Sequence, residues 1–154
     1  YVVLGEGVAY LAVVMDLHTR KVLGVALGPR LSQGLALAAL EMALREGCPE
    51  VHHSDRGVQY TSRAYVERLL GLGVRLSYAG TGRPWEHGHA ERLIRTIKEE
   101  WVALREYRTL AEARASVKAF VLEVYDRKRP HSALGYLTPE AFSESLWKGG
   151  GSPD

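Results

Sequence analysis

The sequence predicts an α/β fold in which a mixed sheet of five strands carries helices on both faces. Apolar runs separated by short turns extend from the first residue to Leu27 and predict an antiparallel meander of three strands. Two short apolar runs then alternate with helical patterns, and two more helical patterns follow. The resulting order, β-β-β-α-β-α-β-α-α, is typical of a layered α/β domain. A chain of 154 residues with 46% hydrophobic side chains is long and apolar enough to build its core.

The predicted meander starts at the first residue. Tyr1–Leu4 has the composition of the end of a strand, and Gly5–Gly7 follows as a tight turn. Ala9–Leu17 is almost wholly apolar, which indicates a strand that is covered on both faces. A short polar turn at Asp16–Arg20 then leads into a third strand, Val22–Leu27.

The middle of the chain alternates between helix and strand. Ser32 is suited to cap a helix over Gln33–Glu46, which is rich in Ala and Leu. Thr61 or Ser62 is suited to cap a second helix that ends near Leu70. The two strands of this part are expected at Glu50–Ser54 and Val74–Ser77.

The last part is predicted to be helical and then irregular. Tyr78–Glu86 contains Gly and Pro and is expected to be a loop, followed by a long helix near His89–Glu106. Thr109 and Glu112 form a capping box that opens a further helix to about Asp126. We expect a loop-like chain from Arg127 onward, so that residues 1–142 form one domain and residues 143–154 a flexible tail.

Composition restricts the classes of protein that fit. The net charge is +2 and the isoelectric point is near 8.8, which permits a polyanionic partner without requiring one. Cys48 is the single cysteine, which excludes an internal disulfide and a cysteine-based zinc site and favours a cytoplasmic setting. Apolar runs are short, so we expect no membrane span.

Two acidic residues, Asp55 and Glu91, are the main candidates for chemistry. Asp55 follows a short strand and precedes Gly57, and Glu91 lies near the start of the long helix, with 35 residues between the two acids. A strand-end Asp and a helix-borne Glu can together hold divalent metal ions that activate phosphodiester chemistry. For Asp55 the alternative is a turn or capping role.

The long helix places Glu91 beside cations. At 100° per residue, Arg95, Lys98 and Arg105 share its face, while an apolar stripe faces the core. This arrangement suits a metal ligand beside a bound phosphate backbone. The alternative is a solvated face held by ion pairs one turn apart.

Other candidate sites are less specific. Asp16 could be a third carboxylate, although an Asp that fixes a turn is the commoner case. The close histidine pairs at 52–53 and 87–89 suggest zinc, but no cysteine or HExxH spacing accompanies them. Cations and aromatic residues at Tyr125–His131, with Arg127, Lys128 and Arg129, have a composition typical of nucleic-acid binding or of an ordinary basic helix end.

Three of these segments resemble one family. His53–Ser62 is similar to the block HSDxGxQYxS, Pro84–Glu91 to PWENGxxE, and Arg129–Phe142 to RPHxALGYxTPxxF. These blocks are typical of the catalytic core of insertion-sequence transposases of the IS3 type, within the retroviral-integrase superfamily. The resemblance extends from about Tyr1 to Phe142, and the interval between Asp55 and Glu91 agrees with it.

The resemblance implies an RNase H-like fold and an Asp-Asp-Glu triad that binds two Mg²⁺ or Mn²⁺ ions. It implies DNA, both transposon ends and target, as substrate, a homo-oligomer as the active complex, and a bacterial, nucleoid-associated setting. Asp55 and Glu91 match the second and third acids of the triad. The first acid is expected on the first strand just before the residue that matches Tyr1, whereas Asp16 matches a position that is usually not a ligand.

Two residues depart from the family pattern: His87 stands for the usual Asn and Arg92 for the usual Ser. Two other interpretations of the chain stay open. One is an RNase H-like nuclease that only hydrolyses, and the other is a non-catalytic remnant that binds DNA or itself.

Overall fold

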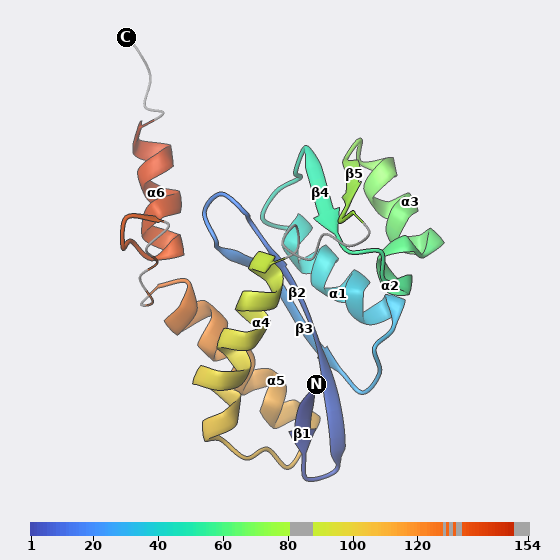
Figure 1. Ribbon diagram of the computed structural model, residues 1–154, viewed down its shortest axis with the longest axis vertical. Helices are drawn as coiled ribbons and strands as arrows, with labels where there is room; N and C mark the ends of the chain where they lie inside the picture. Colours follow the sequence, from blue (N-terminus) through green and yellow to red (C-terminus); the bar gives the residue numbers. More distant parts are fainter. Residues whose placement is uncertain (81–87, 128, 130, 132–133, 150–154) are drawn as a thin grey trace.

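The computed structural model describes residues 1–80, 88–127, 129, 131 and 134–149. The first three strands form the predicted antiparallel meander in the order β1-β2-β3 (Figure 1). Strand β1 is Val2–Leu4, β2 is Gly7–Met15 and β3 is Val22–Gly28. Val13 of β2 lies opposite Val25 of β3, so the expected pairing of these two strands is confirmed.

The remaining strands form a second sheet. β4 (Val51–Ser54) and β5 (Arg75–Tyr78) are parallel neighbours with Ser54 opposite Tyr78. All five predicted strands are therefore present, but the expectation of one continuous five-stranded sheet is wrong for the described residues. The physical reason is that β1 covers only Gly7–Ala9 of β2, and no described strand joins β2 to β4.

Helices cover both faces of the meander, as predicted. α1 (Gln33–Leu44) packs on one face, and α4 (Gly88–Glu100) and α5 (Leu110–Ala119) lie on the other (Figure 1). Side chains of β2 alternate accordingly, because successive residues of a strand point to opposite faces. Leu11 and Val13 pack into the core with α4 and α5, while Tyr10 and Val14 pack with α1.

The long helix is shorter than predicted. α4 ends at Glu100, and a 3-10 turn, Val102–Leu104, follows where helix was expected to Glu106. Trp101 leaves helical geometry, stacks on Phe120 with ring centroids 5.0 Å apart, and donates its indole N–H to Ser116 Oγ at 2.9 Å. Burial of the large indole, with its N–H satisfied, accounts for the early end of the helix.

The elements after α5 differ from the prediction in one respect. A π-helical turn, η3 (Phe120–Tyr125), continues α5 and ends next to Asp126, as expected. The chain beyond is not wholly loop-like, because α6 covers Pro139–Gly149. Thr138 Oγ1 accepts the Ala141 N–H at 3.2 Å, so the sequence Thr-Pro-Glu acts as a helix start.

Two short helices complete the fold between the strands of the second sheet. α2 is Val58–Thr61 and α3 is Arg63–Gly71, with the break at Ser62. In the described ranges no helix combines the length and apolar character needed to cross a bilayer.

Candidate functional site

Strand β4 carries the chain to Asp55. Ser54, the last residue of the strand, is buried, and the backbone then turns sharply. Asp55 Oδ1 accepts the Gly57 N–H at 2.7 Å, so the carboxylate holds its own turn. A Cβ on Gly57 would lie 2.8 Å from Asp55 Oδ1, so a larger residue at this position would displace the carboxylate.

A cluster of three aromatic rings, those of His52, Tyr60 and Tyr65, packs next to this turn. Burial raises the pKa of Tyr60, and the negative charge of Asp55 raises it further. The Tyr60 ring packs edge-on against Tyr65, with centroids 5.5 Å apart. The Tyr65 hydroxyl in turn lies 2.8 Å from His52 Nε2. The turn at Asp55 is therefore fixed from the strand before it and from the helices after it.

Glu91 lies in the first turn of α4 and is exposed. Leu93 and Ile97 anchor the helix in the core, and Arg95 is exposed like Glu91. The predicted amphipathic helix is confirmed in this part. Lys98 lies over the Tyr1 ring, 5.4 Å from its centroid, at the start of β1.

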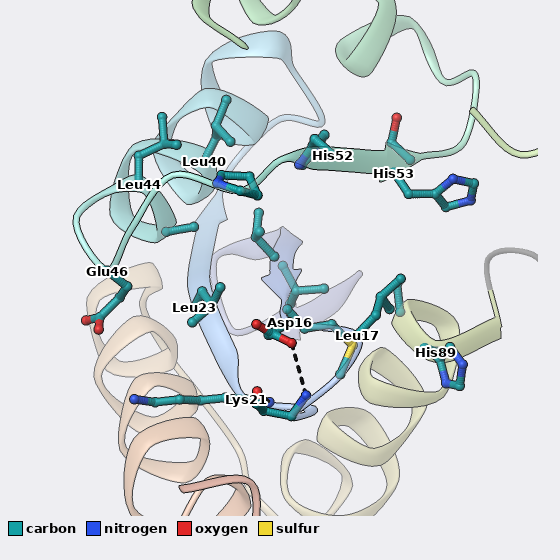
Figure 2. A pocket seen from close by; sticks show the side chains of 18 of the residues that line it. Asp16, Leu17, Lys21, Leu23, Leu40, Leu44, Glu46, His52, His53 and His89 are labelled. Atoms are coloured by element: carbon teal, nitrogen blue, oxygen red, sulfur yellow. Dashed lines mark hydrogen bonds between the residues drawn. The ribbon is translucent and has the colours of Figure 1, made fainter. Parts of the chain in front are cut away.

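A cavity of about 680 Å³ lies between the two sheets and the start of α4 (Figure 2). Its walls include Leu11 and Val13 of β2, and Leu40 of α1. Ser54 and Ala90, the neighbours of Asp55 and Glu91, also line it. The end of β4 and the beginning of α4 therefore open on the same space. A direct approach of the two carboxylates stays a prediction.

Asp16 lines the same cavity and has a structural role. Its Oδ1 accepts the backbone N–H groups of His18 at 2.8 Å and Thr19 at 3.0 Å (Figure 2). Its backbone carbonyl accepts the Arg20 N–H at 2.8 Å. The turn role is the one that the sequence favoured.

The histidines do not form a metal centre in the described residues. His53 Nδ1 lies 2.9 Å from Ser77 Oγ and links β4 to β5, while its Nε2 is buried without a hydrogen bond. His52 is engaged with Tyr65, and His87 lies outside the described residues. Across the described ranges, no group of three or more His, Cys, Asp or Glu side chains could hold a metal ion.

The predicted basic segment after Tyr125 is partly neutralised. Arg127 pairs with Glu140 of α6 at 3.1 Å. Arg129 binds Glu100 of α4 through two contacts, of 2.5 and 3.1 Å. Lys128 lies outside the described residues. These arginines therefore hold the segment after η3 against two helices, and they can meet phosphate only in competition with carboxylates.

One buried carboxyl group was missed by the sequence analysis. Asp126 is 3% exposed, and its Oδ1 accepts the Val22 N–H at 3.0 Å. Its Oδ2 is buried and has no hydrogen-bond partner. Burial raises the pKa of Asp126 to about 6. The preceding apolar run, Phe120–Tyr125, was the only signal in the sequence that this position could be enclosed.

Comparison with known proteins agrees with this architecture. Two family models described as "Integrase core domain" match residues 1–84 and 72–139. The chain belongs to the integrase core domain family.

Sequence relatives include transposases of bacterial insertion sequences. The transposase for insertion sequence element IS904 of Lactococcus lactis is 31% identical over 94% of this chain and 58% of its own length. Transposase InsF for insertion sequence IS3A of Escherichia coli is 36% identical over 92% of this chain and 50% of its own. The resemblance to IS3-type transposases is thus confirmed, and the chain spans about half the length of these relatives.

Solved structures show the same fold. The catalytic core domain of BIV integrase superposes with a TM-score of 0.68 and 19% identity, over 92% of this chain and 90% of that one. The HTLV-2 integrase catalytic core domain in complex with magnesium gives 0.64 and 17%, over 86% and 82%. The fold is therefore RNase H-like, as expected.

Proposed function

We propose that this chain is the catalytic core of a transposase that cleaves DNA strands and transfers them in a reaction dependent on Mg²⁺ or Mn²⁺. The observation that carries this proposal is the common cavity at the end of β4 and the start of α4, which is lined by Ser54 and Ala90, the residues that precede Asp55 and Glu91 in the sequence. Family membership supplies the reaction class. DNA is the proposed substrate, and a homo-oligomer is the proposed active form.

The two carboxylates fit a divalent cation only in part. Asp55 is held in a fixed turn, and Glu91 is exposed on a rigid helix, so both can present oxygen atoms, which Mg²⁺ prefers. The absence of a group of three ligands in the described residues shows that the set is incomplete there. The description of the HTLV-2 integrase core as a magnesium complex supports the choice of metal.

The third carboxylate is proposed to lie on a continuation of β1 ahead of Tyr1. Val2 pairs with Ala9 and Leu4 with Gly7, so the same register would set preceding residues beside Leu11 and Val13. These side chains already line the cavity that separates β2 from β4. A strand in that space would join the two sheets and bring its side chains toward the end of β4.

Each residue then has a defined role. When bound, the metal ions would activate water or a DNA 3′-hydroxyl and stabilise the leaving 3′-oxygen. Asp55 and Glu91 would hold and orient them through their carboxylate oxygens. Gly57 fixes the Asp55 turn, while Arg95 and Lys98 would contact the phosphate backbone beside Glu91.

The test is strand transfer of a labelled transposon end with Mg²⁺. We expect negligible product from the 154-residue chain and clear product from a form extended upstream through the proposed continuation of β1. In the extended form, Asp55→Asn and Glu91→Gln should each abolish strand transfer. Hydrolysis without strand transfer by the intact enzyme would favour the nuclease alternative.

A second candidate function is favoured because no group of three possible metal ligands occurs among the described residues. The chain as given would then bind DNA or itself without catalysis. Strong activity of the short form that is lost in Asp16→Asn would contradict both this candidate and the assignment of an upstream acid.

A further inference from the structure

A tight turn follows the basic segment and is closed by its own backbone. The His131 carbonyl accepts the Leu134 N–H at 3.0 Å and the Tyr136 N–H at 2.8 Å. The His131 N–H in turn donates to the Leu137 carbonyl at 3.0 Å. Leu134 is buried, and the His131 ring packs edge-on against Tyr125 with centroids 5.0 Å apart. The turn is therefore held firmly on the body of the domain.

Tyr136 is the unusual residue of this turn. Its φ of 62° lies in the left-handed region, as does that of the preceding Gly135 at 63°. Glycine adopts this region without steric cost, whereas a bulky side chain there is strained. Burial of the ring does not offset the strain, because Tyr136 is 75% exposed. Strained residues of this kind cluster at ligand-binding sites, so the exposed ring is a candidate contact for a partner.

The surroundings of the turn favour a nucleic acid as that partner. Arg127 pairs with Glu140 at 3.1 Å, which brings this cation to the start of α6, the helix that follows the turn. The Arg127 side chain nevertheless stays 62% exposed. The same helix lies beside the turn between β2 and β3 (Figure 1) and contributes Ser143 to the wall of the cavity. Exposed aromatic rings and cations together are the elements that bind single-stranded nucleic acids.

We propose that the Tyr136 ring stacks on an unpaired base of DNA. This inference rests on the proposed function and adds a contact to a base, whereas the DNA-binding residues named so far would contact phosphates. A ring can stack on any of the four bases, so the contact does not depend on sequence. A base in a duplex is already stacked and paired, so single-stranded DNA is the form that this site fits. The firmly held turn lowers the entropy cost of fixing the ring against its ligand.

The experiment measures binding of the full chain to fluorescein-labelled oligothymidine and to a blunt duplex by anisotropy, over a series of NaCl concentrations. Tyr136→Asn removes the ring and tolerates the left-handed backbone, while Tyr136→Phe keeps the ring. We expect Tyr136→Asn to weaken binding to the single strand by at least about fivefold and Tyr136→Phe to change it by less than about twofold. Because the ring carries no charge, the slope of log K against log salt should be the same for both variants and the wild type. Binding to the duplex should not change.

Two controls separate a ligand contact from other roles of the ring. Leu104→Asn removes a large apolar side chain that is 76% exposed in the 3-10 turn after α4, and it should leave binding to both DNA forms unchanged. Tyr136→Gly relieves the left-handed strain and removes only an exposed ring. Its melting temperature should therefore equal or exceed that of the wild type, although it binds the single strand as weakly as Tyr136→Asn does.

The outcomes separate this inference from the proposed function. If the wild type binds the single strand and Tyr136→Asn binds it equally well, stacking by Tyr136 is wrong and the transposase proposal stands. A clearly lower melting temperature of Tyr136→Gly would make the ring a structural element and would also overturn the inference. Unchanged DNA binding with loss of self-association, measured by sedimentation, would assign the ring to a protein interface instead. If the wild type binds neither DNA form, DNA recognition by this chain fails together with the role of Tyr136.

Discussion

The buried carboxyl group of Asp126 makes stability depend on pH in a defined direction. Burial raises its pKa to about 6 from the ordinary value of 3.8, and Glu140 also raises it, while the Val22 N–H, Lys21 and Arg127 act in the opposite sense. The perturbation that we consider is Asp126→Asn. It keeps an oxygen for the Val22 N–H and removes the ionisable group.

The sign and size follow from linkage. Because the pKa is higher in the folded chain, the folded state binds the proton more tightly than the unfolded state does. The stability contributed by this proton is fully present below about pH 4 and is lost as the pH rises through about 6. A difference of about two pH units corresponds to about 3 kcal/mol at 1.36 kcal/mol each.

The assay is urea unfolding of the wild type and of Asp126→Asn at pH 4 and at pH 7, monitored by circular dichroism. The asparagine variant carries a buried amide N–H in place of Asp126 Oδ2, at a cost of about 1–3 kcal/mol that is the same at both pH values. Between pH 4 and pH 7 the stability of the variant relative to the wild type should rise by up to about 3 kcal/mol.

The control is Glu123→Gln, at an exposed position of η3. Its stability relative to the wild type should not change between the two pH values. If the Asp126→Asn difference is equally constant, Asp126 ionises as an ordinary exposed carboxyl group and the argument from burial is refuted.

Two further predictions concern glycines. A Cβ on Gly24 would lie 2.0 Å from the Ala39 carbonyl oxygen of α1, so Gly24→Ala should destabilise the fold by about 3 kcal/mol. Gly71→Ala, which has open space at the end of α3, should be neutral or stabilise the fold by up to about 1 kcal/mol. Thermal unfolding compares the two variants, and equal melting temperatures would contradict the close packing of Gly24 against α1. Gly57→Ala should displace the Asp55 carboxylate and weaken Mg²⁺-dependent strand transfer by the extended form without unfolding it. Unchanged activity at all Mg²⁺ concentrations would show that strand transfer does not depend on the geometry of the Asp55 turn.

Capping residues and apolar runs in the sequence predicted the helices α1 and α5 and the strand β2 correctly. Ser32 and Thr109 cap α1 and α5 through side-chain oxygens, as their sequence positions indicated. The alternating environment of β2 follows from its uninterrupted apolar run. The helix Pro139–Gly149 was not predicted, although Thr138 followed by Pro139 has the composition of a helix start.

Features that depend on tertiary packing could not be predicted in this way. α4 ends at Glu100 because the next residue, Trp101, stacks on Phe120 and donates a hydrogen bond to Ser116. For the candidate site, the roles of Asp55 and Glu91 stay predictions, and the cavity lined by their neighbours Ser54 and Ala90 depends on packing that the sequence does not reveal.

The edge of β2 from Tyr10 to Met15 has a consequence for how the chain behaves at high concentration. Among the described residues, Tyr10–Met15 pair with β3 on one side of β2, while β1 covers only Gly7–Ala9 on the other side, so that side has no partner strand from Tyr10 onward. Such an edge offers its remaining backbone N–H and C=O groups to any extended segment, including one from a second copy. The 154-residue chain should therefore self-associate through strand exchange as its concentration rises, and an upstream extension that occupies this edge should keep it monodisperse.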